Sequence, residues 1–312
     1  MSGKPRVLVA LFGVLALGPG PGAAVLAGES SNGTYEVEID TWRKGRMERL
    51  MSDTGYLTLS GLFWLDEGEH TFGSAPDNDL VFPKHSAPAH AGVIVRGKDA
   101  TTIQIHGQTP LMLDGKRVSQ TRMIPDSEDG TTMFTLGDLS FYLIQRGDRF
   151  AIRLRDVHSE IRKHFRGIES YPVQESYRVV ARFEPYDPPK EIPILNEVGT
   201  TSISTCPGAL VFTLNGKECR LDPLADSVED ESWFIIFADH TTGEETYGAG
   251  RFLYTGPPVD GKVVVDFNKA YNPPCAFSPY TTCPLPPAQN HLDVAVRAGE
   301  RKYADAAHTA KH

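Results

Sequence analysis

The fold is most apparent in residues 70–95, which read HTFGSAPDNDLVFPKHSAPAHAGVIV. Short runs rich in β-branched and aromatic residues alternate there with Gly, Pro, Asp and Asn, which favour turns. The same pattern extends on both sides over residues 55–155, with apolar runs at residues 57–65, 101–107 and 149–155. Because these runs are short and evenly separated, we predict a β-sandwich of about a hundred residues.

A second β-rich region follows at residues 156–300. It opens with a charged connector, residues 156–172, and continues as short apolar runs between turn residues as far as Ala298. We predict a second β-sandwich or barrel, so the expected fold class is mostly β. The polar tail at residues 301–312 is expected to fray.

One amphipathic helix is expected upstream of the sandwich, at residues 35–52, where apolar residues such as Ile39 recur loosely at helical spacing. Arg43, Arg46 and Arg49 would line another face of this helix. That basic face is either solvated or a stripe that recognises an anion beside a site.

Residues 1–27 have the order of a secretory signal peptide. Lys4 and Arg6 precede an apolar run at residues 7–17, and small residues follow as far as Ala27, the expected cleavage position. The apolar run is much shorter than the roughly 20 residues that a membrane-spanning helix needs. We therefore predict an exported protein, periplasmic or secreted, with no membrane span after cleavage.

The composition excludes several classes of protein. The chain has 312 residues, 31 Lys and Arg against 40 Asp and Glu, and a net charge of −9, which argues against nucleic-acid binding. It has no Gly-x-Ser-x-Gly, His-Glu-x-x-His, phosphate-loop or dinucleotide-binding motif. Familiar hydrolase and nucleotide chemistry therefore lacks support, and the sequence leaves open whether the protein is an enzyme.

Four short elements in and beyond residues 70–95 form a recognisable set: Phe72-Gly73, Asn78-Asp79-Leu80, Ser86 with His90, and Asp114-Gly115. Together they resemble a forkhead-associated (FHA) domain, which implies a β-sandwich. The resemblance would also imply phosphopeptide binding, through an arginine directly after the first glycine. Ser74 stands at that position. Because a phosphate dianion needs charge-assisted donors, phosphopeptide binding is not expected.

The last third of the chain carries a second set of motifs: Thr246-Tyr247-Gly248-Ala249-Gly250-Arg251-Phe252-Leu253, Asp266-Phe267-Asn268, Tyr271-Asn272-Pro273-Pro274-Cys275-Ala276-Phe277, Cys283-Pro284-Leu285-Pro286-Pro287 and Asn290. Upstream, Phe165-Arg166-Gly167, Tyr171-Pro172 and Tyr177-Arg178-Val179 fit the same pattern. This pattern resembles the family of domain of unknown function 1684 (DUF1684). The resemblance implies a shared fold and a shared polar centre, and no known reaction.

Residues 271–290 are predicted to form a stiff loop, because their prolines forbid a helix or a sheet interior. A loop of this length in a compact domain is usually functional or strongly tied down. We predict that a small ligand, of anionic character, binds around it. Arg251 would supply the charge, while Asn268, Tyr271 and Asn290 would supply hydrogen bonds.

Arg251 also has a structural alternative, an ion pair with Asp239 or Asp266. Two other functions stay open beside ligand binding. One is a hydrolase-like enzyme that uses the same polar cluster, and the other is a structural envelope protein.

The four cysteines fall into two pairs. Cys206 and Cys219 flank the expected hairpin turn at Asn215-Gly216, and we predict a disulfide between them. Cys275 and Cys283 lie on the Pro-rich loop, and a disulfide between them suits an exported protein.

Three other roles stay open for Cys275 and Cys283. They could bind zinc with His291 and Asp266. One of them could be a nucleophile with His291 as its base. They could also be inert buried thiols. The group that would orient His291 is Asn290, Asn268 or Asp266.

Overall fold

The computed structural model describes residues 31–303, which form two compact units. The first unit comprises residues 58–159, and the second comprises residues 32–57 together with residues 160–303. Both units are built mainly from strands, and one long helix precedes them in the chain, which confirms the predicted fold class. The predicted signal peptide and its cleavage position lie outside the described residues, as does the last part of the predicted tail.

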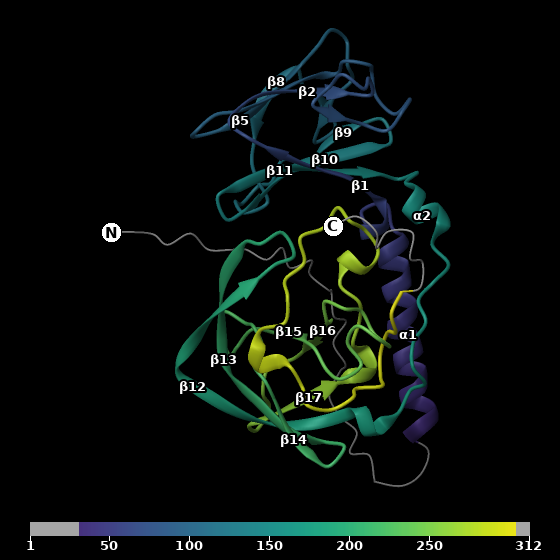
Figure 1. Ribbon diagram of the computed structural model, residues 1–312, viewed down its shortest axis with the longest axis vertical. Helices are drawn as coiled ribbons and strands as arrows, with labels where there is room; N and C mark the ends of the chain where they lie inside the picture. The colour runs from purple at the N-terminus through teal and green to yellow at the C-terminus, as the bar shows by residue number, and fades with distance from the viewer. Residues whose placement is uncertain (1–30, 304–312) are drawn as a thin grey trace, which may run out of the picture. The chain divides into compact units, whose positions relative to one another are not determined.

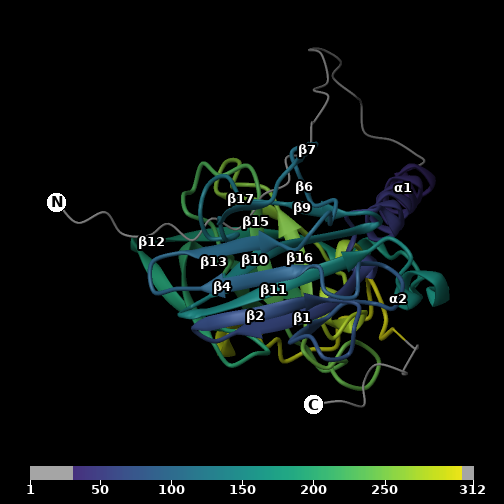
Figure 2. The same cartoon turned by 90° about the horizontal axis from the view of Figure 1, so that it is seen from above.

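The first unit is a sandwich of two mostly antiparallel sheets, in which only β2 and β3 pair in parallel. One sheet has the order β1-β11-β10-β9-β6-β7 and the other β3-β2-β4-β5-β8. Figure 2 shows β1, β11 and β10 side by side. The strands are β1 (Leu59–Leu65), β2 (Gly68–Gly73), β3 (Leu80–Val81), β4 (Gly92–Arg96), β5 (Thr101–Ile105), β6 (Met112–Leu113), β7 (Lys116–Arg117), β8 (Gln120–Met123), β9 (Phe134–Leu136), β10 (Leu139–Arg146) and β11 (Arg149–Asp156).

The core of the sandwich is aromatic. Phe72, Phe82, Phe134 and Phe141 are at most 1% exposed, and their ring centroids lie 5.5–5.9 Å apart where they contact. Tilted and edge-on contacts at this separation are favourable beyond the burial of apolar area. Phe72 and Phe82 come from residues 70–95, the segment from which the sandwich was predicted.

The residues at the FHA-like positions form hydrogen bonds that hold the loops of this unit. The Asp79 carboxylate accepts hydrogen bonds from the N–H and the hydroxyl of Thr71, both at 2.8 Å. The Asn78 amide donates to the carbonyl oxygen of Ala89 at 2.8 Å. A Cβ on Gly73 would lie 2.3 Å from that same oxygen, so only glycine fits there. Ser74 donates its hydroxyl to a loop carbonyl at 2.8 Å, so the residue that replaces the expected arginine has a structural role.

The second unit combines a four-stranded antiparallel sheet, in the order β14-β13-β12-β17, with a two-stranded sheet of β15 and β16. In Figure 1, β12 and β13 form a long curved pair. The strands are β12 (Arg178–Leu195), β13 (Thr201–Leu214), β14 (Lys217–Leu221), β15 (Trp233–Phe237), β16 (Arg251–Thr255) and β17 (Lys262–Asp266). The helices are α1 (Ser31–Met51) and α2 (Glu160–His164), with short 3₁₀ turns η1 (Tyr56–Thr58), η2 (Glu175–Tyr177), η3 (Phe267–Lys269), η4 (Pro274–Ala276) and η5 (Ala288–Asn290).

Two local features set the shape of the four-stranded sheet. The β13–β14 hairpin turns at Asn215-Gly216, where both residues have positive φ, as an Asn-Gly turn requires. The register between β12 and β13 shifts between Pro185 and Lys190, so the chain bulges there. Pro188 and Pro189 lie in this bulge, where the sheet requires no hydrogen bond from the backbone N–H that proline lacks.

Helix α1 belongs to the second unit, although it precedes the sandwich in the sequence. It buries Ile39 and Leu50, and Leu50 packs with Phe165 and Phe277. In Figure 1, α1 runs beside the C-terminal end of the described chain. It begins earlier than the predicted Tyr35.

The first residues of the predicted tail are held in place. The backbone N–H of Arg301 donates to Glu169 and that of Lys302 to Glu245. The ring of Tyr303 lies 5.0 Å from that of Phe277. The prediction that the chain frays from Arg301 onward is therefore wrong for these three residues. Within residues 31–303, no helix combines the length and the hydropathy needed to cross a membrane.

Candidate functional site

Arg251 forms a fully buried ion pair. Phe237 at the end of β15 pairs with Arg251 at the start of β16, which places Asp239 beside the guanidinium. The two side chains are 0% exposed, and Arg251 Nη2 lies 2.8 Å from Asp239 Oδ2. Arg251 also donates to the carbonyl oxygens of Val296 and Ala298. The ion pair with Asp239, the structural alternative for Arg251, is therefore confirmed.

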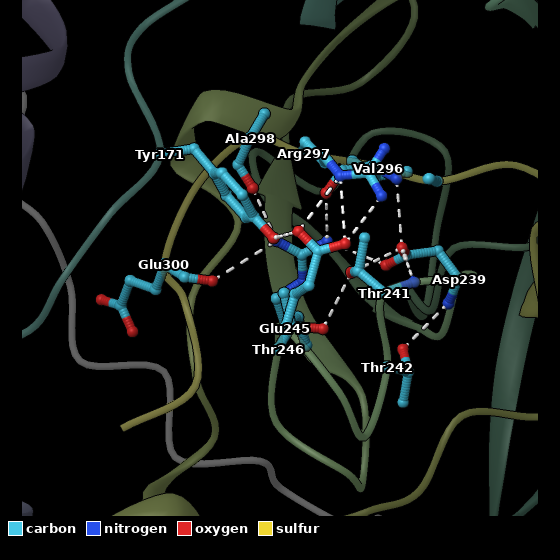
Figure 3. Close-up of polar contacts among 12 residues, drawn as sticks. Tyr171, Asp239, Thr241, Thr242, Glu245, Thr246, Val296, Arg297, Ala298 and Glu300 are labelled. Carbon is cyan, nitrogen blue, oxygen red and sulfur yellow. Dashed lines mark hydrogen bonds and ion pairs between the residues drawn. The ribbon is translucent and has the colours of Figure 1, made fainter. Parts of the chain in front are cut away.

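Asp239 organises the loop that follows β15. Its Oδ1 accepts hydrogen bonds from the N–H and the hydroxyl of Thr241, at 2.8 and 2.7 Å, and from the N–H of Val296 at 3.1 Å. The Thr241 hydroxyl in turn lies 3.0 Å from that of Thr246. With the bond from Arg251, four donors of the protein itself therefore satisfy this buried carboxylate, and Figure 3 draws the contacts of Asp239 with Thr241.

A second ion pair lies at the surface of the same cluster. Glu245 accepts hydrogen bonds from the Arg297 guanidinium, the shortest at 2.7 Å, and from the Tyr171 hydroxyl at 2.9 Å (Figure 3). The bonds from Arg297, and then from Tyr171, lower the pKa of the Glu245 carboxyl. Burial, followed by the neighbouring carboxylate, raises the pKa of Tyr171 to about 12.

The basic face predicted on α1 recognises a carboxylate of the protein itself. Arg46 is 8% exposed and donates to Glu300 at 3.1 Å and to the carbonyl oxygen of Asn272 at 2.9 Å. The other Glu300 oxygen accepts the N–H of Asn272 at 2.7 Å. The Arg46 guanidinium also lies over the ring of Tyr271, 4.5 Å from its centroid. Tyr271, predicted to bind a ligand, is thus half-buried beneath a cation.

Asn268 and Asn290, also predicted to bind a ligand, are 0% and 1% exposed. Asn268 exchanges two hydrogen bonds with the backbone of Gln174. Asn290 accepts the N–H of Asp222 at 2.7 Å and donates to the carbonyl oxygens of Asp222 and Ile236. Both amides bond to the protein's own backbone, so their role is structural.

Asp266, a candidate for zinc binding or for orienting His291, lies at the end of β17. Its Oδ1 accepts the Tyr35 hydroxyl at 2.8 Å and the N–H of Asn268 at 3.1 Å, so it caps η3 and anchors α1. His291 is exposed and follows η5. Neither residue joins the two loop cysteines, so the predicted zinc set is not assembled.

The loop cysteines form a disulfide. Cys275 and Cys283 are bonded, with their Cα atoms 6.2 Å apart, which is within the usual range. This bond leaves no thiolate to act as the nucleophile that was considered. A carboxylate oxygen of Glu197, a residue not predicted to belong to a site, lies within 4.8 Å of both sulfurs.

The disulfide predicted between Cys206 and Cys219 is absent, and both are free, buried thiols. The hairpin register explains the difference. Cys219 lies opposite Phe212, six residues along β13 from Cys206. Six residues of extended chain span about 20 Å, far beyond the reach of a disulfide. Flanking the Asn-Gly turn therefore does not bring the two cysteines together, because β13 is much longer than β14 and Cys206 lies far from the turn.

A solvent-facing groove lies beside the end of the Pro-rich loop. Its volume is about 480 Å³, within the usual range for small-molecule sites. The bulged part of β12, the end of β14 and the start of η5 form its walls. The lining residues are Tyr186, Lys190, Glu191, Ile192, Pro193, Arg220, Asp222, Pro287, Ala288 and Gln289.

None of these lining residues was predicted from the sequence to bind a ligand, although Pro287, Ala288 and Gln289 lie on the predicted Pro-rich loop. The only local signal was the pair of prolines in Tyr186-Asp187-Pro188-Pro189, which is typical of a bulge. Arg220 and Lys190 are brought together by the β12–β13–β14 ladder, which a single sequence does not reveal.

No curated protein matches this chain. Among solved structures, it is similar to an uncharacterized protein of Haloarcula marismortui, at 34% identity over 47% of this chain and 81% of that one, with a TM-score of 0.39. It is also similar to the FHA-2 domain of a Mycobacterium tuberculosis ABC transporter, at 27% identity over 28% of this chain and 77% of that domain, with a TM-score of 0.22.

The sequence comparison with protein families concerns the second unit. Residues 163–301 match the family described as "Protein of unknown function (DUF1684)". This range covers the Arg251–Asp239 pair, the Pro-rich loop and the groove. Residues 163–301 therefore belong to the DUF1684 family, as the motifs in the last third of the chain predicted.

Proposed function

We propose that this protein is an exported binding protein that holds a small organic anion in the groove beside the Pro-rich loop. The observation that carries the proposal is the Lys190 ammonium, which lies at the groove without a carboxylate partner among residues 31–303. Its Nζ lies 3.5 Å from the centroid of the Tyr186 ring. A cation over an aromatic face is held in position, yet keeps donors for a ligand.

Arg220 and Asp222, two other charged residues of the groove, already have partners, so Lys190 and the exposed Glu191 are the charged groups left to meet a ligand. Arg220 donates to Glu184 at 2.9 Å and to the Tyr186 hydroxyl at 2.6 Å. The Tyr186 hydroxyl donates to Asp222 at 2.9 Å. This chain of contacts fixes the Tyr186 ring and hence the ammonium above it.

The walls indicate what the rest of the ligand resembles. Ile192, Pro193 and Pro287 give the groove apolar surface, and Gln289 adds an amide. A carboxylate or phosphate monoester with a compact apolar body would match both parts. The three backbone bonds of Asn290 hold Asp222 and η5 against each other, so the groove is pre-formed and little ordering is lost on binding.

Titration of small organic carboxylates and phosphate monoesters, by thermal shift and then by calorimetry, tests the proposal. Lys190→Met keeps most of the side-chain length and removes the charge, so we expect at least a tenfold weaker affinity, about 1.4 kcal/mol. Lys262→Met is the matched control, since Lys262 is also exposed and borders a smaller cavity of about 270 Å³. Binding that depends on Lys262 instead, or no binding by any anion of the panel, would contradict the proposal.

Export is the second part of the proposal. The order of charged, apolar and small residues before Gly28 supports it, as does the disulfide in the Pro-rich loop, since disulfides persist outside the reducing cytosol. Sequencing the N-terminus of the protein recovered from the exported fraction should find Gly28. Recovery of the intact chain in the cytosol alone would refute export.

A further inference from the structure

Three metal-ligand groups meet where the β12–β13 turn crosses the Pro-rich loop. The Cys275 and Cys283 sulfurs and a carboxylate oxygen of Glu197 all lie within 4.8 Å of one another. Two thiolates on one tetrahedral zinc ion lie about 3.8 Å apart, given a Zn–S bond of about 2.3 Å. The three groups are thus close enough to share one ion after small shifts.

The backbone holds these groups together from both sides. The Glu197 N–H donates to the Cys283 carbonyl oxygen at 3.0 Å, and Asn196 forms a β-bridge with Pro284. The turn that carries Glu197 is therefore pinned to the residues around Cys283. The side chain of Glu197 is directed by the Tyr247 hydroxyl, which donates to it at 3.2 Å.

The sulfurs are surrounded by donors that favour negative charge. The Cys275 N–H donates to the Cys283 sulfur at 3.2 Å, and the Cys283 N–H donates to the Cys275 sulfur at 3.3 Å. The Thr281 hydroxyl donates to the Cys275 sulfur at 2.8 Å. Hydrogen bonds to the charged form of a group stabilise that form, so these donors would support thiolates once the disulfide is opened.

We propose that the reduced Cys275–Cys283 pair and Glu197 form a Zn²⁺ site, and that the disulfide is its closed, metal-free state. A thiol or phosphine reductant supplies two electrons, the S–S bond breaks, and two protons from water or buffer give two thiols. Zn²⁺ then forms two Zn–S bonds and one Zn–O bond, and two protons return to the buffer. Because Glu197 is exposed and Cys275 is half-buried, the fourth ligand position faces solvent.

The other cysteines do not compete for the ion. Cys206 and Cys219 are buried, and no third ligand group accompanies either of them among residues 31–303. Burial raises the pKa of Cys206 to about 12, which disfavours the thiolate that zinc requires. Zinc suits the mixed sulfur and oxygen set, whereas Ca²⁺ and Mg²⁺ require oxygen ligands.

Metal titration of the full chain in both redox states tests this site. The reduced protein, freed of phosphine, should bind one Co²⁺ with the intense sulfur-to-cobalt absorption of two thiolates, and one equivalent of Zn²⁺ should displace it. Native mass spectrometry should show one zinc per chain in the reduced form and none in the oxidised form. Equal binding by the oxidised protein would overturn the proposal. So would the absence of binding by reduced protein for which alkylation of a separate aliquot has shown that Cys275 and Cys283 are both free thiols.

Variants separate the site from other metal binding. Cys275→Ser should abolish the Co²⁺ absorption, and Cys219→Ala should leave it unchanged. Glu197→Gln, an exposed change that the fold tolerates, should weaken Zn²⁺ at least tenfold while the sulfur absorption persists at saturation. Unchanged affinity in Glu197→Gln would remove the carboxylate from the site. The groove at Lys190 is not involved, so failure here leaves the anion proposal untouched.

Discussion

The Arg251–Asp239 pair illustrates how a polar residue can be indispensable without contacting a ligand. Taking two charges out of water is costly, and only dense hydrogen bonding repays that cost. Here the carboxylate has backbone and hydroxyl donors, and the guanidinium has carbonyl acceptors from residues 296–300. The pair therefore ties the last strand-like segment of the chain to the loop after β15.

Arg251→Met should destabilise the protein by about 3–5 kcal/mol, because it leaves the buried Asp239 carboxylate without its cation. Adding Asp239→Asn should recover part of the loss. Arg297→Met is the control, since it breaks an exposed pair with Glu245 and should change the free energy of unfolding much less than Arg251→Met does. Urea unfolding measures all three variants. Equal small losses in Arg251→Met and Arg297→Met would contradict a structural role for Arg251.

Cys206 predicts a pH dependence of stability. Its pKa is raised by burial to about 12 from an ordinary value of 9.0, so between these two values the unfolded chain releases a proton that the folded chain keeps. The free energy of unfolding should then fall as pH rises above 9, by at most about 1.4 kcal/mol per unit from this group. Below pH 9 the group adds no slope.

Comparison of the wild type with Cys206→Ala isolates this contribution. The wild type should lose more stability than the variant between pH 8 and pH 10.5, measured by urea unfolding at each pH. Tyr171, whose pKa is also raised, titrates over the upper part of this range in both proteins and cancels in the difference. Parallel pH profiles would show that the Cys206 thiol ionises equally in both states.

At the scale of elements, the Pro-rich loop is held by a covalent bond and by short turns. The bond joins residues eight apart, so the chain-entropy account assigns it about 2.5 kcal/mol. η4 and η5 both start after prolines, whose fixed φ suits the first turn. The loop thereby keeps one shape without any ladder of its own.

Reduction of Cys275–Cys283 should lower the free energy of unfolding by up to about 2.5 kcal/mol in metal-free buffer. Unfolding in urea with and without a phosphine reductant, both with chelator present, measures the difference. Cys275→Ser with Cys283→Ser should respond to reductant no further, because Cys206 and Cys219 are already thiols. A continuing response in that double variant would contradict the assignment of the bond.

Several elements were predictable from local sequence, and others depended on contacts that one sequence does not show. Turn residues and apolar runs located the sandwich and the Asn215-Gly216 hairpin. β12 contains prolines, which usually interrupt a sheet, yet a bulge lets the strand continue to Leu195. Polar residues around the Pro-rich loop were assigned to a ligand, because their burial and their partners, such as Arg46 for Tyr271, are long-range properties that one sequence does not show.

At the scale of the whole molecule, the sandwich interrupts the sequence of the second unit. Residues 32–57 supply most of α1, and residues 160–303 supply the sheets and the loops of the same unit. Without α1, the carboxylates of Glu300 and Asp266 would lose Arg46 and Tyr35. The region matched by the family begins after this helix, so it omits part of the unit's own core.

Residues 58–159 expressed alone should unfold cooperatively, because their core is self-contained. Residues 160–312 alone should not, because buried carboxylates and the face covered by Ile39 and Leu50 would be exposed. Joining residues 32–57 to residues 160–312 by a flexible linker should restore cooperative unfolding, as followed by circular dichroism. Cooperative unfolding of residues 160–312 without the helix would contradict the assignment of α1 to this unit.

The position of α1 in the sequence also determines when each unit can fold during synthesis of the chain. Arg46 and its partner Glu300 are 254 residues apart in the sequence. At ordinary rates of synthesis, Glu300 is therefore made on the order of ten to fifty seconds after Arg46. The sandwich, whose contacts are all nearer in sequence, can close in the meantime. The second unit cannot, because the segment that completes its charge pairs is translated last. A secretion channel that accepts only extended polypeptide would therefore meet this half of the protein still unassembled.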